Sequence, residues 1–120
     1  NANVNKRIES LAKNKHRLQA LHLHDNNGEG DQHQPPFYGT VDWERLAQII
    51  ASSSYPREIS FEMSGANTPH FKEGVPANQQ TYEARLAFAR DAYSRCARFV
   101  EMVDARRVAG AAAGGPRKPD

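Results

Sequence analysis

The sequence predicts an α/β fold with a parallel sheet, of which this chain holds only a part. Helical and strand-like segments alternate along the 120 residues, and strands that alternate with helices form parallel sheets with right-handed crossovers. Two strand-like segments are present, and two strands do not make a stable sheet by themselves. The hydrophobic fraction is 38%, whereas a free-standing domain usually carries more apolar residues. We therefore expect further strands from a missing N-terminal part or from a partner chain.

The first half of the chain predicts a helix, a strand and a second helix. Apolar residues recur at helical spacing over residues 3–17. A short strand follows over residues 18–25 and leads into the turn-rich string DNNGEGDQ. After this loop, Asp42 is a good N-cap for a helix that continues to about residue 52.

The second half predicts a strand over residues 58–63, a Gly- and Pro-rich loop over residues 64–77 and a long helix over residues 79–106. Residues 1–106 would then form the folded segment, and residues 107–120 a low-complexity, disordered tail. The buried face of the long helix is expected to carry residues three or four apart in sequence, namely Leu86, Ala89, Tyr93, Cys96, Val100 and Val103.

Each predicted strand has one apolar face and one titratable face. Side chains two apart in a strand share a face, so His22 and His24 point away from the leucines beside them, and Glu62 points away from Phe61. A buried parallel strand normally reads as continuously apolar. The pattern instead fits a barrel in which His22, His24 and Glu62 look inward, at the carboxyl ends of the strands where active sites lie.

His22, Glu62, Asp31 and His33 form a predicted divalent-metal site. Neighbouring strands are ~4.8 Å apart, so an imidazole and a carboxylate can share an ion with bonds of ~2.0–2.2 Å. Asp31 and His33 add a second nitrogen and oxygen pair from the long loop over residues 25–41. Such ligands suit Mn, Mg, Co or Zn. One alternative stays open, since an inward His is often a core residue and a strand-end Glu is often an ion-pair partner.

The single cysteine and the lack of a long apolar run indicate the expected compartment. A single Cys96 excludes an internal disulfide and agrees with a reducing compartment. No apolar run approaches the ~18 residues of a membrane span, and we expect no secretory leader. We therefore expect a cytoplasmic protein with Cys96 as a buried, inert thiol. His16 and His70 have no comparable neighbours in the sequence and are expected at the surface.

Two strings in the sequence resemble the xylose isomerase-like superfamily of (β/α)8 TIM barrels. Its members include sugar and sugar phosphate isomerases and epimerases, and endonucleases of the endonuclease IV type. LHLHDNNGEGDQHQPPFYGTVDW, residues 21–43, is similar to the stretch that opens the seventh barrel loop. ISFEMS, residues 59–64, is similar to the eighth strand with its metal-binding Glu. The resemblance implies the C-terminal part of such a barrel, about the last two strands with their helices.

By this resemblance, His22 and Glu62 match the metal ligands of the seventh and eighth strands. Asp31 and His33 match a D-x-H pair that holds an additional zinc in the endonuclease branch. In isomerases with one metal, the same pair lines the pocket or lies near the ion.

The resemblance also bears on substrate contacts. His24 and Asp25 match residues that face the substrate or stand behind the metal ligands. The family's P-G-x-G turn is replaced by Pro36-Phe37-Tyr38-Gly39, which would bring two aromatic rings to the mouth of the pocket.

The resemblance implies a metal-dependent sugar or sugar phosphate isomerase or epimerase, with Glu62 as one of two catalytic acid/base groups. An endonuclease IV-like zinc phosphodiesterase acting on abasic DNA is the first alternative, and an inactive barrel fragment that needs a partner is the second. The loop over residues 25–41 contains acidic residues and no Lys or Arg, which disfavours a polyanion. The expected partners are therefore a small sugar and the remainder of the barrel, without nucleic acid or membrane, and this chain alone is expected to be inactive.

Overall fold

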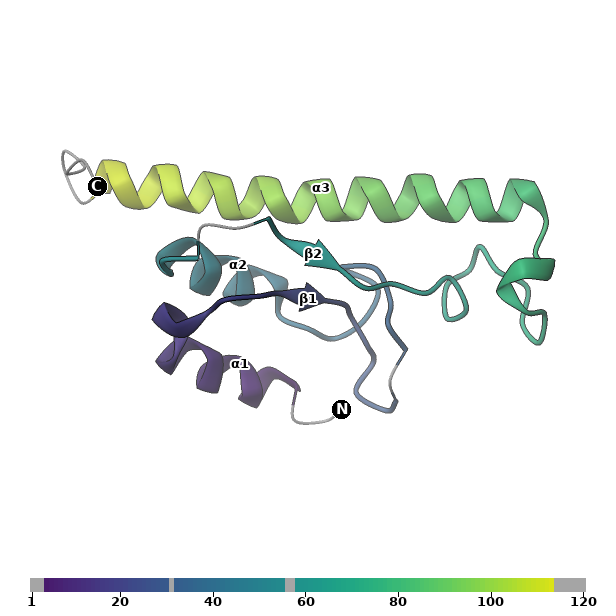
Figure 1. Ribbon diagram of the computed structural model, residues 1–120, viewed down its shortest axis with the longest axis horizontal. Helices are drawn as coiled ribbons and strands as arrows, with labels where there is room; N and C mark the ends of the chain where they lie inside the picture. The colour runs from purple at the N-terminus through teal and green to yellow at the C-terminus, as the bar shows by residue number, and fades with distance from the viewer. Residues whose placement is uncertain (1–3, 31, 56–57, 114–120) are drawn as a thin grey trace.

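The computed structural model describes residues 4–30, 32–55 and 58–113. In this part of the chain, helices and strands alternate in the order that the sequence predicts (Figure 1). The elements are α1 (Val4–Lys13), β1 (His22–Leu23), α2 (Trp43–Ser52), β2 (Ser60–Phe61) and α3 (Tyr82–Ala113), with 3₁₀ turns at Lys15–Arg17 and Ala77–Gln79.

The two strands run parallel and side by side, as predicted. His22 lies opposite Ser60, and Leu23 lies opposite Phe61. The Glu62 amide continues the pairing by donating to the Leu23 carbonyl at 2.9 Å. Both strands are shorter than predicted, because each has only the other as a hydrogen-bonded neighbour within the described residues.

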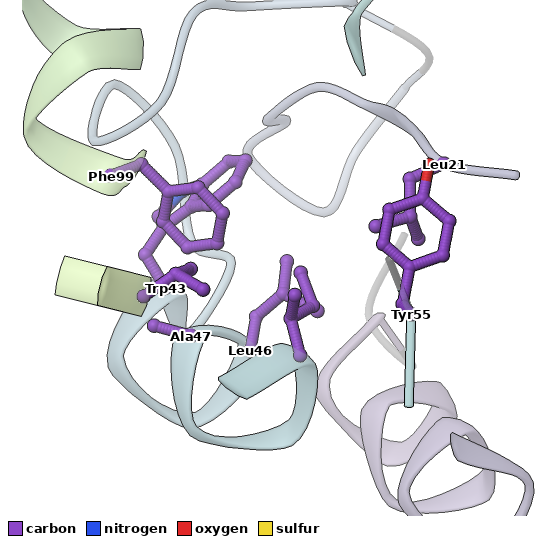
Figure 2. Close-up of a cluster of buried hydrophobic side chains, with 8 residues drawn as sticks. Leu21, Trp43, Leu46, Ala47, Tyr55 and Phe99 are labelled. Carbon is purple, nitrogen blue, oxygen red and sulfur yellow. The ribbon is translucent and has the colours of Figure 1, made fainter. Parts of the chain in front are cut away.

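The hydrophobic core lies where α2 and α3 meet the sheet. Figure 2 shows its centre, where Phe99 of α3 meets Trp43 of α2 edge-on with ring centroids 5.0 Å apart. Phe61 of β2 packs against Phe99 in the same way at 6.1 Å, an arrangement that aromatic pairs favour. The buried members of the core are Leu21, Trp43, Leu46, Ala47, Ile50, Tyr55, Phe99 and Val103.

The core confirms the predicted faces of the strands at the positions that matter for a site. Leu21 is buried, and Phe61 packs against the core from the same side. His22, Ser60 and Glu62 are exposed. The titratable side chains therefore lie opposite the helices.

Helix α2 begins and ends where its sequence predicts. The Asp42 carboxylate caps it by accepting from the Arg45 amide at 3.0 Å, which satisfies one of the free N–H groups of the first turn. Trp43, Leu46, Ala47, Ile49 and Ile50 form its buried face. The N-cap and the spacing of the apolar residues are both features of the local sequence, which is why the bounds of α2 could be predicted.

Helix α3 differs from its prediction at its C-terminal end. It continues past Arg106 to Ala113, so the predicted disordered tail over residues 107–120 is helical in its first part. The run of alanines explains this, since Ala has the highest helix propensity. The last residues of that predicted tail, 114–120, lie outside the described residues.

The buried face of α3 differs in part from its prediction. Val103 is buried as predicted, and Ala92 and Phe99 are buried as well. The predicted core residue Tyr93 is 78% exposed, and Ala89 is exposed too. The helix carries apolar residues at helical spacing on two adjacent faces. The face with Phe99 lies inside because that ring fills the space between Trp43 and β2.

Cys96 lies on the inner side of α3, with its sulfur 3.6 Å from the Met63 sulfur. Burial raises the pKa of its thiol to about 11. At pH 8 the thiolate fraction of the native thiol should therefore be about 200-fold lower than that of an ordinary thiol of pKa ~8.5, and its reaction with a disulfide reagent at least tenfold slower. The rate should rise as the pH approaches 11, and also when the chain is unfolded in denaturant. Equal rates for native and unfolded protein at pH 8 would contradict this.

Candidate functional site

Three of the predicted metal-ligating residues come together beside the two strands. His22 is the first residue of β1, Glu62 directly follows β2, and His33 lies in the loop after β1. The Nδ1 atom of His22 lies 3.9 Å from Oε2 of Glu62. The Nε2 atom of His33 lies 4.0 Å from Oε1 of the same carboxylate. Glu62 thus has an imidazole nitrogen beside each of its oxygens. Asp31, the fourth predicted ligand, lies outside the described residues.

The distances between these donor atoms permit a shared metal ion only if each imidazole moves closer to the Glu62 carboxylate. Two donors that bind one ion at ~2.0–2.2 Å cannot be more than ~4.4 Å apart, and in a tetrahedral site they are ~3.4 Å apart. The two separations at Glu62 fall between these values, so each imidazole must approach the carboxylate by about half an ångström. Among the described residues, no three His, Cys, Asp or Glu side chains are close enough together to hold an ion. The described residues thus supply two imidazole–carboxylate pairs at Glu62, and the atoms of each pair must move closer together before they can bind one ion.

His33 is held in place by its backbone and by a neighbouring ring. Its φ of 49° is in the left-handed region, which a non-glycine residue keeps only when its surroundings fix it. Its carbonyl accepts from the Ser64 amide at 2.7 Å. Its imidazole stacks on that of His24, with ring centroids 4.0 Å apart. These contacts direct the His33 ring towards Glu62.

His24, a predicted substrate contact, has an unsatisfied polar atom. Its Nδ1 is buried and has no hydrogen-bond partner among the described residues. A buried nitrogen without a partner costs about 1–3 kcal/mol. The atom is therefore available to a bound molecule or to a residue outside this part of the chain.

Of the two roles expected for Asp25, facing the substrate or standing behind the metal ligands, its burial fits the second. It is fully buried, and its carboxylate is surrounded by four N–H donors that cross the loop over residues 25–41. Oδ1 accepts from Asn26 and Val41, and Oδ2 from Gly39 and the Trp43 indole, at 2.7–3.1 Å. Its role is to fold the loop that carries His33.

Gly39 permits this arrangement because it has no side chain. A Cβ at this position would collide with the Asn26 carbonyl and lie 2.6 Å from the Asp25 carboxylate. Gly39→Ala should therefore lower the free energy of unfolding by about 1–3 kcal/mol, as overpacking does elsewhere. Urea unfolding followed by tryptophan fluorescence measures the change. Gly30→Ala is the control, because its nearest neighbour lies at an ordinary 3.8 Å. Equal stability of the two variants would contradict the steric role of Gly39.

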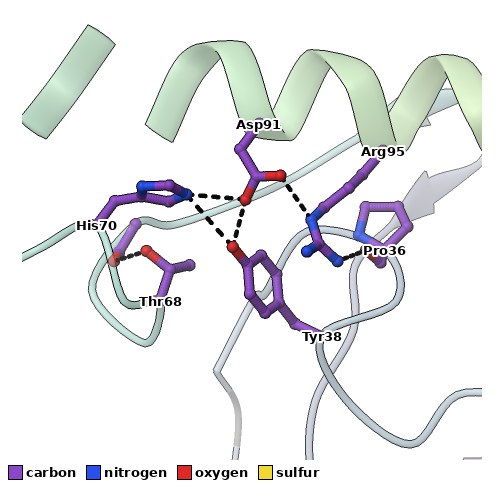
Figure 3. A network of polar contacts seen from close by, with 7 residues as sticks. Pro36, Tyr38, Thr68, His70, Asp91 and Arg95 are labelled. Carbon is purple, nitrogen blue, oxygen red and sulfur yellow. Dashed lines mark hydrogen bonds and ion pairs between the residues drawn. The ribbon is translucent and has the colours of Figure 1, made fainter. Parts of the chain in front are cut away.

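A second polar group, the Asp91 cluster, consists of Tyr38, His70, Asp91 and Arg95 (Figure 3). The Tyr38 hydroxyl donates to the Asp91 carboxylate, and His70 Nε2 lies 2.9 Å from the same oxygen. Arg95 donates from Nε to the other oxygen at 2.9 Å, and its guanidinium lies 3.7 Å from the centre of the Tyr38 ring. Three different segments of the chain meet here.

The Asp91 cluster corrects two predictions. His70 is not a free surface residue, since its side chain is 25% exposed and bonded to Asp91. Tyr38 and Phe37 do not stand free at a pocket mouth. Tyr38 belongs to the cluster, and Phe37 packs against Trp43 at 5.9 Å, with Arg98 over its ring.

The charge state of the cluster follows from its hydrogen bonds. Burial by itself raises the pKa of Asp91, but the bonds from Tyr38, His70 and Arg95 outweigh it and lower this pKa to about 2. Burial and the bond to Asp91 raise the pKa of Tyr38. A carboxyl group whose pKa is lower in the folded state stabilises the fold above its ordinary pKa of ~3.9, and this contribution disappears as the pH falls towards 2. The cluster is therefore intact across the neutral range.

Comparisons with known proteins give one partial relationship and no assigned activity. The chain is 38% identical over 56 residues to the uncharacterized protein y4fM of Sinorhizobium fredii, a match that covers 47% of this chain and 18% of that protein. The chain thus covers less than a fifth of the relative's length. No family model and no solved structure matches the chain. In the described segments, no helix is long and apolar enough to cross a membrane.

Proposed function

We propose that this chain is the C-terminal part of a (β/α)8 barrel enzyme, a metal-dependent sugar or sugar phosphate isomerase or epimerase. The observation that carries the proposal is the position of the His22 and His33 imidazoles, 3.9 and 4.0 Å from the two oxygens of Glu62. Glu62 directly follows β2 and His33 lies in the loop after β1, so both stand on the carboxyl-terminal side of adjacent parallel strands, where barrel enzymes have their active sites. Helices α2 and α3 cover the opposite, apolar side, as the outer helices of a barrel do.

The remainder of the barrel is the partner that the proposal requires. A sheet of two strands is too small to be stable alone, and the His24 Nδ1 atom lacks a partner in the described part of the chain. A protein of which 56 residues make up 18% is roughly 300 residues long, enough for a complete barrel of ~250 residues. The relative's length is therefore compatible with the missing strands.

In this proposal the residues of the chain bind a metal ion and transfer a proton at the carbon beside the substrate carbonyl. A divalent ion, Mn, Mg, Co or Zn, would polarise that carbonyl. His22, His33 and Glu62 would hold the ion, and the Glu62 carboxylate would also accept a proton from the adjacent carbon. His24 would present its buried nitrogen to the bound sugar. The second acid/base group would come from the remainder of the barrel, so the chain alone would be inactive.

Two assays on the intact protein that carries this chain test the proposed reaction. The first measures metal-dependent interconversion of aldoses and ketoses, or of their phosphates, and the second measures cleavage of DNA at an abasic site. We expect turnover in the first assay alone. Cleavage of abasic DNA without sugar turnover would replace the isomerase by a zinc phosphodiesterase, and activity in neither assay would contradict an enzyme of either class.

A further inference from the structure

Building on the proposed function, we infer that the Asp91 cluster is a positioning device that keeps the His33 imidazole beside Glu62. The cluster contains none of the proposed metal ligands. It instead ties together the two loops that follow β1 and β2, and His33 belongs to the first of them.

Helix α3 supplies the fixed side of this device. Asp91 and Arg95 are one helical turn apart and form an ion pair at 2.9 Å. Arg95 also donates to the Pro36 carbonyl at 3.0 Å, and Asp91 accepts from Tyr38. The Pro36 carbonyl and the Tyr38 side chain, both in the first loop, are thereby attached to the helix. His70, from the loop that follows β2, attaches the second loop to the same carboxylate (Figure 3).

The two loops are also joined to each other around His33. The Ser64 amide donates to the His33 carbonyl at 2.7 Å. The Gln34 side chain donates to the Asn67 carbonyl at 2.9 Å, and the Asn67 side chain donates to the Gln32 carbonyl at 3.3 Å. His33 and both of its sequence neighbours are thus bonded to the loop after β2, the loop that His70 attaches to Asp91.

The backbone of His33 explains why such a restraint is needed. A φ of 49° costs energy for a residue with a Cβ and persists only where several contacts hold it. If the loop detaches from α3, His33 can relax to an ordinary conformation. Its imidazole would then leave the position 4.0 Å from the Glu62 carboxylate.

Hydrogen exchange of single amides in the intact protein that carries this chain, prepared without metal, tests the inference. The variants are Asp91→Ala, which removes the carboxylate, and Tyr38→Phe, which removes one hydroxyl. In Asp91→Ala the Ser64 amide should exchange about tenfold faster, while the Ile50 amide in the buried centre of α2 stays within about twofold. Tyr38→Phe should show a smaller change in the same direction. Glu9→Gln is the matched control, because it breaks the Glu9–Arg45 ion pair between α1 and α2, away from both loops.

Several results would overturn the inference. One is an unchanged Ser64 amide in Asp91→Ala, and another is equal acceleration at Ser64 and Ile50, which would mean a general loss of stability. A Ser64 amide that is already unprotected in the unmodified chain would also overturn it, because the His33 backbone would then not be fixed.

Titration of the intact protein with Co²⁺ separates this inference from the proposed function. Asp91→Ala should weaken Co²⁺ binding about tenfold, because His33 loses its fixed position. If the unmodified protein binds no Co²⁺ but Ser64 still responds, the metal proposal is wrong and the positioning of His33 stands. If Co²⁺ binds equally in both proteins and Ser64 does not respond, the positioning role is wrong and the metal site stands.

Discussion

Replacing Asp25 by Ala is expected to lower the free energy of unfolding by about 3–5 kcal/mol, since four buried donors lose their acceptor at once. These donors include the indole N–H of Trp43, at 2.7 Å from Oδ2, which ties the loop to the first turn of α2. The chain has one Trp, so its fluorescence during urea unfolding reports both the local change and the overall transition.

Asp42→Ala is the matched control for the Asp25 variant. It also removes a carboxylate that accepts a backbone N–H, but Asp42 is exposed at the start of α2. Loss of an N-cap costs about 1 kcal/mol. An equal loss of stability in the two variants would contradict the central role of Asp25 in the loop.

Replacing Glu62 by Gln is expected to lower kcat for sugar interconversion by about 10²–10⁴-fold, because the amide neither accepts the substrate proton nor binds a divalent ion well. Its side chain is 62% exposed, so the free energy of unfolding should change by no more than about 0.5 kcal/mol. Steady-state kinetics and thermal unfolding of the intact protein measure the two effects.

Glu101→Gln provides the control for Glu62. Glu101 is also exposed, but it belongs to α3, which packs on the apolar side of the sheet, opposite His22 and Glu62. We expect full activity in this variant. Retained activity in Glu62→Gln, or a loss of folding that accompanies the loss of activity, would contradict the proposed role of Glu62.

The parts of the fold that the sequence predicts well are those with local signals. The N-cap at Asp42 and the apolar spacing that follows it lie within a few residues of each other, and α2 has the predicted bounds. The alternation of apolar and polar residues along β1 and β2 likewise determines which side chains point away from the core. Parallel pairing then brings His22 and Glu62 together, because His22 lies opposite Ser60 and Glu62 is two residues further along the same face.

The parts that the sequence does not predict depend on distant contacts. The pair of Asp91 and Arg95 can be read from its helical spacing, but nothing local shows that Tyr38 and His70 join it from two loops. Asp25 is a predicted site residue by its resemblance, and only the fold of the loop shows that it is buried. The choice between the two apolar faces of α3 likewise depends on where Trp43 lies.

The metal content of the intact protein that carries this chain tests the central claim most directly. We predict about one divalent ion per barrel for the unmodified protein, as a site with N and O donors from several strands requires. The ion should be lost in His22→Ala and in Glu62→Gln, while Glu101→Gln should keep it. A folded, unmodified protein that binds no divalent ion, or variants of His22 and Glu62 that keep a full equivalent, would contradict the proposed site.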